Sequence, residues 1–212
     1  MIQLFGFPVF KKSLSDKEYD RVGLIKTISD NYNLDNDRNV WDKDYSYIHH
    51  CADDMNNNLF KEPDYSTVLP LYEEAIQEFL KQLNFKNYVK YKWSIVNYTC
   101  MANGQYMREH SHTNADFTSV HYLQYDDKTN NSTTYHNTSH HSKYIDSIRP
   151  RFKDNFDSFD IKNSWMFETF KLPTRQDDLV IFPAMFYHSI SRVNTNKKRM
   201  TIIFNFEVNN YE

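Results

Sequence analysis

Residues 104–116 read Gly104-Gln-Tyr-Met-Arg-Glu-His110-Ser-His112-Thr-Asn-Ala-Asp116. In an extended strand, side chains two positions apart point to the same face, so His110 and His112 would present their imidazoles side by side. A third histidine, His188, lies far downstream, just before another strand-like run. Imidazole binds iron, zinc, copper and nickel. Three imidazoles therefore predict a site for one metal ion, with positions left open for other ligands.

Histidine pairs also arise in this chain without an evident purpose. It contains 9 His, among them the adjacent pairs His49-His50 and His140-His141. The His110-x-His112 spacing taken alone is therefore as typical of a surface or structural role as of metal binding. The residues downstream of His188 favour metal binding.

Arg199 and Thr201 share one face of the strand-like run 199–208. A guanidinium beside a hydroxyl suits a carboxylate, because arginine offers a planar pair of donors and threonine offers a further one. An arginine that points into a barrel would bury its charge, which is costly unless an anion binds. A surface arginine in the Lys197-Lys198-Arg199 turn, or a structural ion pair, is the simpler interpretation of Arg199 by itself.

The pattern of apolar residues predicts a mainly β chain. We expect a short strand at 4–10, a helix from Ser15 to Ile28 that starts with capping-box spacing, and a helix from Thr67 to Leu83. Polar residues 30–66 and a polar insertion at 126–160 predict loops, and an insertion of that length is typical of a lid or an interaction segment. Further strands are expected at 88–100, 117–125, 165–170, 178–182, 188–193 and 199–208. We therefore expect a single domain over 1–212, with an α/β support (1–87) and a sandwich or barrel core (88–212).

Composition excludes several classes of protein. The net charge of −3 shows no basic footprint for nucleic acid. The two cysteines, Cys51 and Cys100, form no Cys-x-x-Cys pair, which indicates a reducing compartment without a disulfide framework. No apolar run reaches the roughly 18 residues of a membrane span, and the first residues do not resemble a signal peptide. We therefore expect a soluble cytoplasmic protein with a core rich in aromatic rings, because the chain has 16 Tyr and 16 Phe.

The motifs occur in a characteristic order. They are Trp93–Tyr98, Gly104, His110-x-His112, Ser119-Val-His-Tyr122-Leu123, Phe182-Pro183, His188 and Arg199-x-Thr201 before Phe204-Asn205. This ordered set resembles the iron(II)/2-oxoglutarate oxygenase superfamily, and in particular a branch of marine bacteria and their tailed phages. The resemblance is weak over 30–65 and 126–164. A phage protein of this kind would work in the host cytoplasm.

The resemblance implies a fold, a metal site and a cosubstrate site. The fold would be a double-stranded β-helix (a jelly-roll or cupin-like barrel) with N-terminal helices packed on one sheet. His110, His112 and His188 would hold Fe(II) in a shared pocket. Arg199 and Thr201 would bind the distal carboxylate of 2-oxoglutarate, assisted by Tyr98 or Tyr122, of which Tyr98 is preferred, and O2 would be the second cosubstrate. No catalytic residue beyond the metal site is implied.

One departure from the superfamily pattern leaves the third ligand open. The usual set is two histidines and a carboxylate, with the acid two positions after the first histidine, where this chain has His112. Either three imidazoles hold the iron, or Asp116 or Glu109 supplies the carboxylate. The implied activity is 2-oxoglutarate-dependent hydroxylation of a C–H bond. The substrate is unknown, with a preference for a protein or peptide side chain.

Two other functions compete with the hydroxylase. The first is a three-histidine, cupin-like dioxygenase that does not use 2-oxoglutarate, against which the Arg199-x-Thr201 pair argues. The second is a binding module that keeps the barrel without catalysis, which the polar insertion favours. Metal content and dependence on 2-oxoglutarate would distinguish the three.

Overall fold

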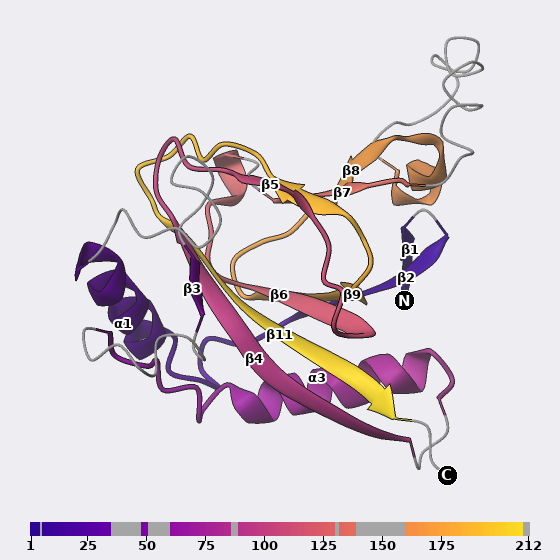
Figure 1. The fold of residues 1–212 in the computed structure, drawn as a ribbon, viewed down its shortest axis with the longest axis horizontal. Helices are drawn as coiled ribbons and strands as arrows, with labels where there is room; N and C mark the ends of the chain where they lie inside the picture. Colours follow the sequence, from indigo (N-terminus) through magenta and orange to yellow (C-terminus); the bar gives the residue numbers. More distant parts are fainter. Residues whose placement is uncertain are drawn as a thin grey trace.

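Two antiparallel β-sheets of unequal size form the body of the structure (Figure 1). The structure is a computed structural model that describes residues 1–4, 6–34, 48–50, 60–85, 89–129, 132–138 and 160–209. The larger sheet has the order β1 (Ile2–Leu4), β2 (Phe7–Ser13), β9 (Asp178–Pro183), β6 (Phe117–Gln124), β11 (Arg199–Asn209), β4 (Lys90–Met101) and β3 (Ile48–His50). The smaller sheet has the order β5 (Met107–His110), β10 (His188–Ile190), β7 (Thr133–His136) and β8 (Thr169–Lys171). From β4 onward the chain moves repeatedly between the two sheets, so segments far apart in the sequence come together.

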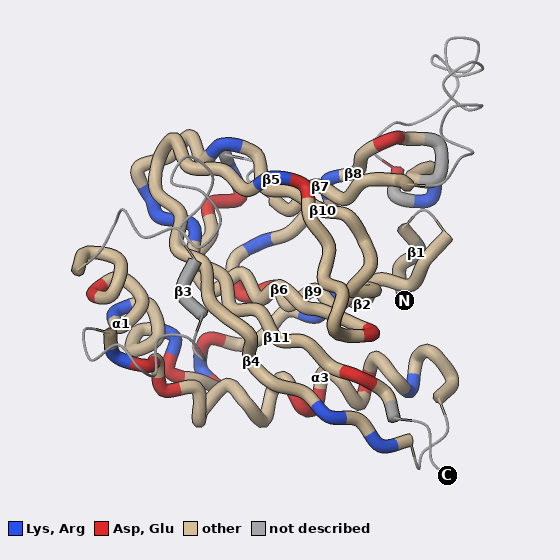
Figure 2. The backbone as a smooth tube through the Cα atoms, viewed as in Figure 1, with Lys and Arg blue, Asp and Glu red and all other residues tan. Residues whose placement is uncertain are grey.

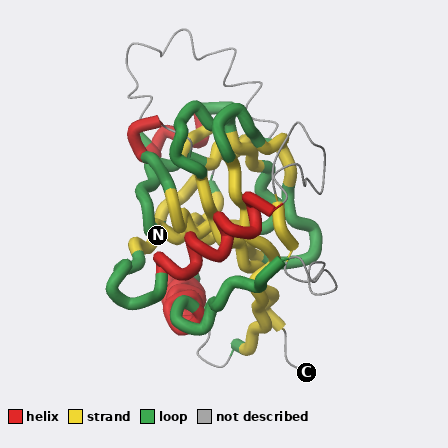
Figure 3. Tube along the Cα trace, turned by 90° about the vertical axis from the view of Figure 1, so that its left-hand side faces the viewer, coloured by secondary structure: helices red, strands yellow, loops and turns green. Residues whose placement is uncertain are grey.

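The two long helices cover one face of the larger sheet (Figure 3). They are α1 (Arg21–Leu34) and α3 (Leu69–Gln82). In β11, alternate side chains point to opposite faces, and one set packs under the helices: Met200, Ile202, Phe204 and Phe206. Phe79 of α3 contacts the rings of Phe10, Phe117 and Phe206. This layer is the aromatic core that composition predicts. The other face of β11 is turned toward the space between the two sheets.

The first helix begins later than the sequence predicts. Ser15 and Glu18 form a turn, in which the Glu18 N–H donates to the Ser15 carbonyl at 3.0 Å. The helix starts at Arg21 because Asp20 caps it, accepting from the Gly23 N–H at 2.9 Å. The helix expected at Thr67–Leu83 is confirmed as α3, with Pro70 in its first turn.

Two loop and strand expectations are wrong. The segment 126–160 was expected to be one polar insertion, yet it contains the short 3-10 helix Asp127–Thr129 and strand β7. Its residues 130–131 and 139–159 lie outside the described ranges. The strand expected at 165–170 is instead a 3-10 helix, Ile161–Met166, followed by the short strand β8. The side chain of Asp160 accepts from the Lys162 N–H and so caps the start of that helix. The strand therefore begins only after the helix ends.

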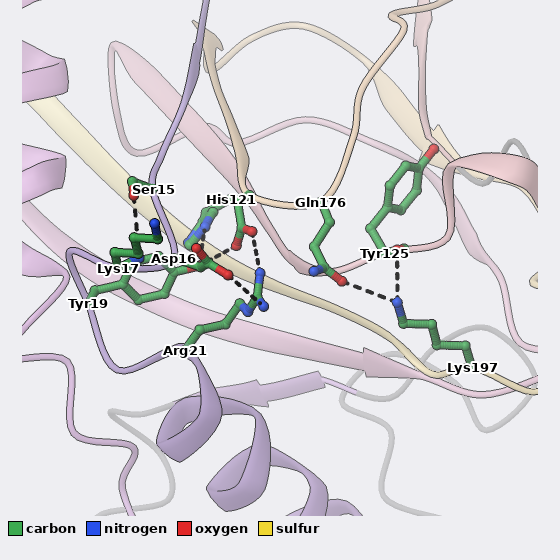
Figure 4. Close-up of polar contacts among 10 residues, drawn as sticks. Ser15, Asp16, Lys17, Tyr19, Arg21, His121, Tyr125, Gln176 and Lys197 are labelled. Carbon is green, nitrogen blue, oxygen red and sulfur yellow. Dashed lines mark hydrogen bonds and ion pairs between the residues drawn. The ribbon is translucent and has the colours of Figure 1, made fainter.

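A buried polar chain ties the helices to the larger sheet (Figure 4). His121 of β6 has one ring nitrogen 2.7 Å from the Tyr72 hydroxyl of α3 and the other 3.3 Å from the Tyr19 hydroxyl. Tyr19 donates to Asp177, which also pairs with Arg21 at the start of α1. Burial lowers the pKa of His121 to about 3, so its ring is neutral and its two nitrogens act as one donor and one acceptor.

Charged residues of both signs are interspersed along the described backbone (Figure 2). Among the helices that the structure describes, none is long and apolar enough to cross a membrane.

Candidate metal and carboxylate site

Three histidines meet where the smaller sheet faces the larger one. In the pairing of β10 with β5, His188 lies directly opposite His110. The His110 and His188 ring centroids are 4.1 Å apart, and His112 lies 5.5 Å and 5.3 Å from them. One ligand atom from each ring lies within 4.8 Å of the others. Strand pairing therefore brings together imidazoles from two separate parts of the chain.

His112 reaches this cluster from outside the strand. β5 ends at His110, so the two side chains do not sit on one regular strand as the sequence predicts. The His112 N–H instead donates to the Ala184 carbonyl at 2.8 Å, which fixes the loop beside the β9–β10 turn.

Backbone carbonyls orient two of the rings. The Nδ1 of His110 lies 2.9 Å from the Arg108 carbonyl, and the Nδ1 of His188 lies 2.8 Å from the Phe186 carbonyl. A carbonyl only accepts, so each Nδ1 carries the proton and each Nε2 presents a lone pair. Metal-binding histidines are commonly oriented in this way.

Burial keeps these rings neutral. It lowers the pKa of His110, and it lowers the pKa of His188 well below the usual value, with His110 adding to the effect. Burial, followed by the nearby His110, lowers the pKa of His112 to about 4. Neutral imidazoles are the form that binds metal, so the donor set suits a divalent ion such as Fe(II) at neutral pH.

The two candidate carboxylates lie outside the cluster. Asp116 Oδ2 accepts from the Val208 N–H at 2.7 Å, at the far end of β11. Glu109 Oε2 lies 3.5 Å from the Nδ1 of His136. Among the described residues, the group of three that converges as a possible metal site is His110, His112 and His188.

A cradle of hydroxyls surrounds a buried arginine in the same pocket. Arg199 is only 2% exposed, and its Nη1 and Nη2 lie 3.5 Å from the hydroxyls of Thr201 and Thr133. Thr201 Oγ1 is 2.6 Å from Thr99 Oγ1 on β4. Burial lowers the pKa of Arg199, so the charged guanidinium is less favourable here than in water. A cation and several hydroxyls in this arrangement suit a carboxylate.

The pocket contains both groups. Its walls include the three histidines, Arg199 and Thr201, and the space between them, with the adjoining solvent, is about 420 Å³. An ion at the histidines and an anion at Arg199 would share this space. One end of the pocket thus offers three imidazoles, and the other end offers a buried guanidinium with hydroxyls.

The two tyrosines suggested by the sequence lie on different sides of the larger sheet. Tyr122 stands behind the cradle, where its hydroxyl donates to Thr133 Oγ1 at 2.8 Å and its ring centroid lies 5.2 Å from the Arg199 guanidinium carbon. Tyr98 packs under the helices, and its hydroxyl accepts from Asn31 Nδ2 at 3.0 Å. Its neighbours Asn97 and Thr99 line the pocket, so Tyr98 faces away from it.

Sequence reasoning missed three polar residues of the pocket wall: Asn97, Thr99 and Thr133. The register pairs Thr99 with Thr201, so alternation along β4 would have found Thr99 once that pairing was known. Thr133 lies within the segment expected to be an insertion, where no periodicity marks a strand.

Comparison with protein families gives one match. The family model 2OG-FeII_Oxy_5, described as "Putative 2OG-Fe(II) oxygenase", matches residues 93–205. That range contains the three histidines and Arg199. A search of curated protein sequences finds no match.

Solved structures share the fold at low sequence identity. A prolyl-4-hydroxylase from Pseudomonas putida is 9% identical, with a TM-score of 0.54 and coverage of 96% of this chain and 94% of that one. The viral collagen prolyl hydroxylase from Paramecium Bursaria Chlorella virus-1, in its 2OG complex, is 14% identical, with a TM-score of 0.52 and coverage of 93% and 94%. The carbocyclase SnoK from nogalamycin biosynthesis is 12% identical, with a TM-score of 0.56 and coverage of 94% and 79%. The expected double-stranded β-helix is confirmed.

Proposed function

Because this chain belongs to the 2OG-Fe(II) oxygenase family, we propose that it hydroxylates a C–H bond of its substrate with Fe(II), 2-oxoglutarate and O2. His110, His112 and His188 would hold the iron. Arg199, with the Thr201 and Thr99 hydroxyls, would hold the distal carboxylate of 2-oxoglutarate. Asp116 is not part of this proposed ligand set, because its side chain bonds the backbone of Val208.

The observation that carries the proposal is one pocket with two ends. The imidazoles supply three neutral donors at one end, and a buried guanidinium stands at the other. 2-Oxoglutarate is a dicarboxylate that also binds the metal. It would therefore use both ends of the pocket, the metal at the histidines and Arg199 for its distal carboxylate. A dioxygenase that binds its substrate directly on the metal has no need of Arg199.

The residues of the chain would bind and orient rather than react. With iron bound, the overall chemistry is that a C–H bond, O2 and 2-oxoglutarate give a C–OH group, succinate and CO2. Arg199 would fix the direction of the cosubstrate, and Tyr122 would hold Thr133 in place through their hydrogen bond. Met107, Val120 and Ile190 line the pocket and would exclude water from it.

The proposal is tested by adding Fe(II) and then 2-oxoglutarate without oxygen, and by measuring succinate after air is admitted. A visible charge-transfer band and succinate release are expected for the unaltered protein. His188→Ala should lose both, whereas His136→Ala, a histidine of the same sheet outside the cluster, should retain both. If the unaltered protein binds iron yet gives neither band nor succinate, the 2-oxoglutarate function is wrong.

A further inference from the structure

A groove lies on the same face of the larger sheet as the pocket, further along β4 and β11. Its walls include Ser94 of β4, Asn205 of β11, and Asn114 and Ala115 of the loop after the histidine motif. The groove and its adjoining solvent measure about 750 Å³. In Figure 1 the start of β4 and the end of β11, which contribute residues to the groove, lie near the C-terminus.

The strand register places pocket and groove on the same face of the larger sheet. Along β11, Thr201 and Ile203 line the pocket, and the next residues of the same face, Asn205 and Glu207, line the groove. Ile203 pairs with Asn97 and Phe204 with Ile95, so β4 has one extra residue at this point. The groove therefore leads away from Arg199, past Asn97.

Two amide oxygens along this surface are buried without a hydrogen-bond partner. They are Asn97 Oδ1, in a residue that is 7% exposed, and Asn205 Oδ1. A buried acceptor that lacks a donor is costly, and native proteins rarely keep one without a reason. In the wall of a ligand site, the simplest reason is that a ligand supplies the donor.

The spacing of the two asparagines suits donors spaced along an extended chain. Asn97 lies opposite Ile203, and Asn205 is two residues further along β11. Because the two asparagines lie on neighbouring strands, they are diagonal neighbours about 7–8 Å apart, and their side chains can adjust to the roughly 6.6 Å between N–H groups on one edge of an extended peptide.

Charge in the groove does not call for an ionic ligand. At its outer end, Lys92 Nζ lies 3.0 Å from Glu207 Oε2, so the two charges offset each other. A neutral chain of amide groups fits this lining better than a phosphate backbone, which would require unpaired basic residues.

We propose that the groove binds an extended peptide segment of a protein substrate, whose backbone N–H groups donate to Asn97 and Asn205. The segment would run parallel to β11 and carry one side chain to the histidine cluster. This inference rests on the proposed function, because it assigns the substrate class of that same site.

The first test asks whether the asparagines serve the fold or a ligand, and it needs no substrate. Asn97→Leu and Asn205→Leu should leave the thermal midpoint of the substrate-free protein unchanged or raised, because each removes an unpaired acceptor. Asn97→Ala and Asn205→Ala repeat the measurement with less bulk. If all four variants lower the midpoint by more than about 5 °C, the asparagines serve the fold and the proposal is overturned.

The second test uses a displayed library of random 12-residue peptides. The probe protein is the full chain, loaded with Fe(II) and 2-oxoglutarate under anaerobic conditions. We expect the unaltered protein to enrich peptides from the library. The same peptides should bind the double variant Asn97→Ala/Asn205→Ala at least tenfold more weakly than they bind the unaltered protein. They should bind the control Asn196→Ala, which is altered at an exposed loop position, as tightly as the unaltered protein. Equal binding by the double variant would overturn the groove assignment.

Two further results separate this inference from the proposed function. If the protein gives the charge-transfer band and releases succinate but enriches no peptide, the peptide class is wrong and the oxygenase function stands. If the double variant instead weakens 2-oxoglutarate binding more than tenfold, as read from the band, the amides serve the cosubstrate and the proposal is again overturned.

Discussion

Replacing Arg199 should remove cosubstrate binding while leaving the protein folded. The change we develop is Arg199→Met, which keeps much of the side-chain length and removes the charge. Arg199 is 2% exposed, so solvent does little to screen its interaction with a bound carboxylate.

The magnitude follows from the contacts that would be lost. A hydrogen bond to a charged group contributes about 1.5–3 kcal/mol, and a guanidinium can make two to one carboxylate. The hydroxyls of Thr201 and Thr99 remain and offset part of this loss. A net loss of about 3–4 kcal/mol corresponds to a roughly 100- to 1000-fold weaker affinity for 2-oxoglutarate.

The unfolding free energy without ligand should change much less. The hydrogen bonds from Arg199 to Thr201 and Thr133 are long, at 3.5 Å, and burial already disfavours the charged form. Replacing a buried charge with an apolar side chain of similar volume is often neutral or stabilising. We expect a change within about 1–2 kcal/mol.

The assay is thermal unfolding of the metal-loaded protein, without oxygen, at increasing 2-oxoglutarate. At a concentration 100 times the dissociation constant, the ligand stabilises the unaltered protein by about 2.7 kcal/mol. At the same concentration, a variant with 100-fold weaker affinity gains only about 0.4 kcal/mol. For a chain of this size, these values correspond to midpoint shifts of roughly 5–10 °C and about 1 °C.

The control is Arg192→Met, at an exposed arginine whose Nη1 donates to the Gly104 carbonyl. It should respond to 2-oxoglutarate like the unaltered protein. An Arg199→Met protein that still shifts by the full amount would refute the role given to Arg199. Loss of folding without ligand would refute the stability argument.

Three other changes probe the site and the buried polar chain. His112→Asp restores the usual two-histidine, one-carboxylate set, so metal should be retained in equilibrium dialysis, while 2-oxoglutarate should bind about tenfold more weakly because the added negative charge opposes it. Tyr122→Phe removes the donor to Thr133, so the free energy of unfolding in urea should fall by about 1–2 kcal/mol and the affinity for 2-oxoglutarate should fall a few-fold. Tyr106→Phe is the control. The pKa of His121 is lowered from its usual 6.5 to about 3 by burial, so between these values the unfolded chain binds a proton that the native one does not, and stability falls as the pH falls. For metal-free protein we expect the unaltered chain to lose about 2–3 kcal/mol more stability than His121→Asn between pH 7 and pH 4.5, as measured by urea titrations at the two pH values.

The sequence predicted the architecture because its signals were local and ordered. Regular apolar spacing predicted α3, and strand-like runs predicted β6, β9 and β11. The fold then required only that these strands pair in two sheets, which the motif order of the family already implied.

Details that depend on the register between strands could not be predicted from the sequence. Which face of β4 looks into the pocket depends on its pairing with β11 and on the extra residue near Asn97. Without that register, Tyr98 was preferred over Tyr122, although it is Tyr122 that stands behind the hydroxyl cradle around Arg199. Thr133 was hidden for a different reason, since a four-residue strand among polar residues has no periodic pattern.

The opposition of His110 and His188 across two short strands has a consequence for how the barrel closes. An ion held by both would join parts of the chain that are distant in sequence, much as a cross-link does, and would offset the entropy of closing the intervening loop. Strands as short as β5 and β10 gain little from their own pairing. Bound iron would then stabilise the smaller sheet as well as take part in the reaction. Loss of the iron would destabilise the pairing of β5 with β10, which positions two of its ligands.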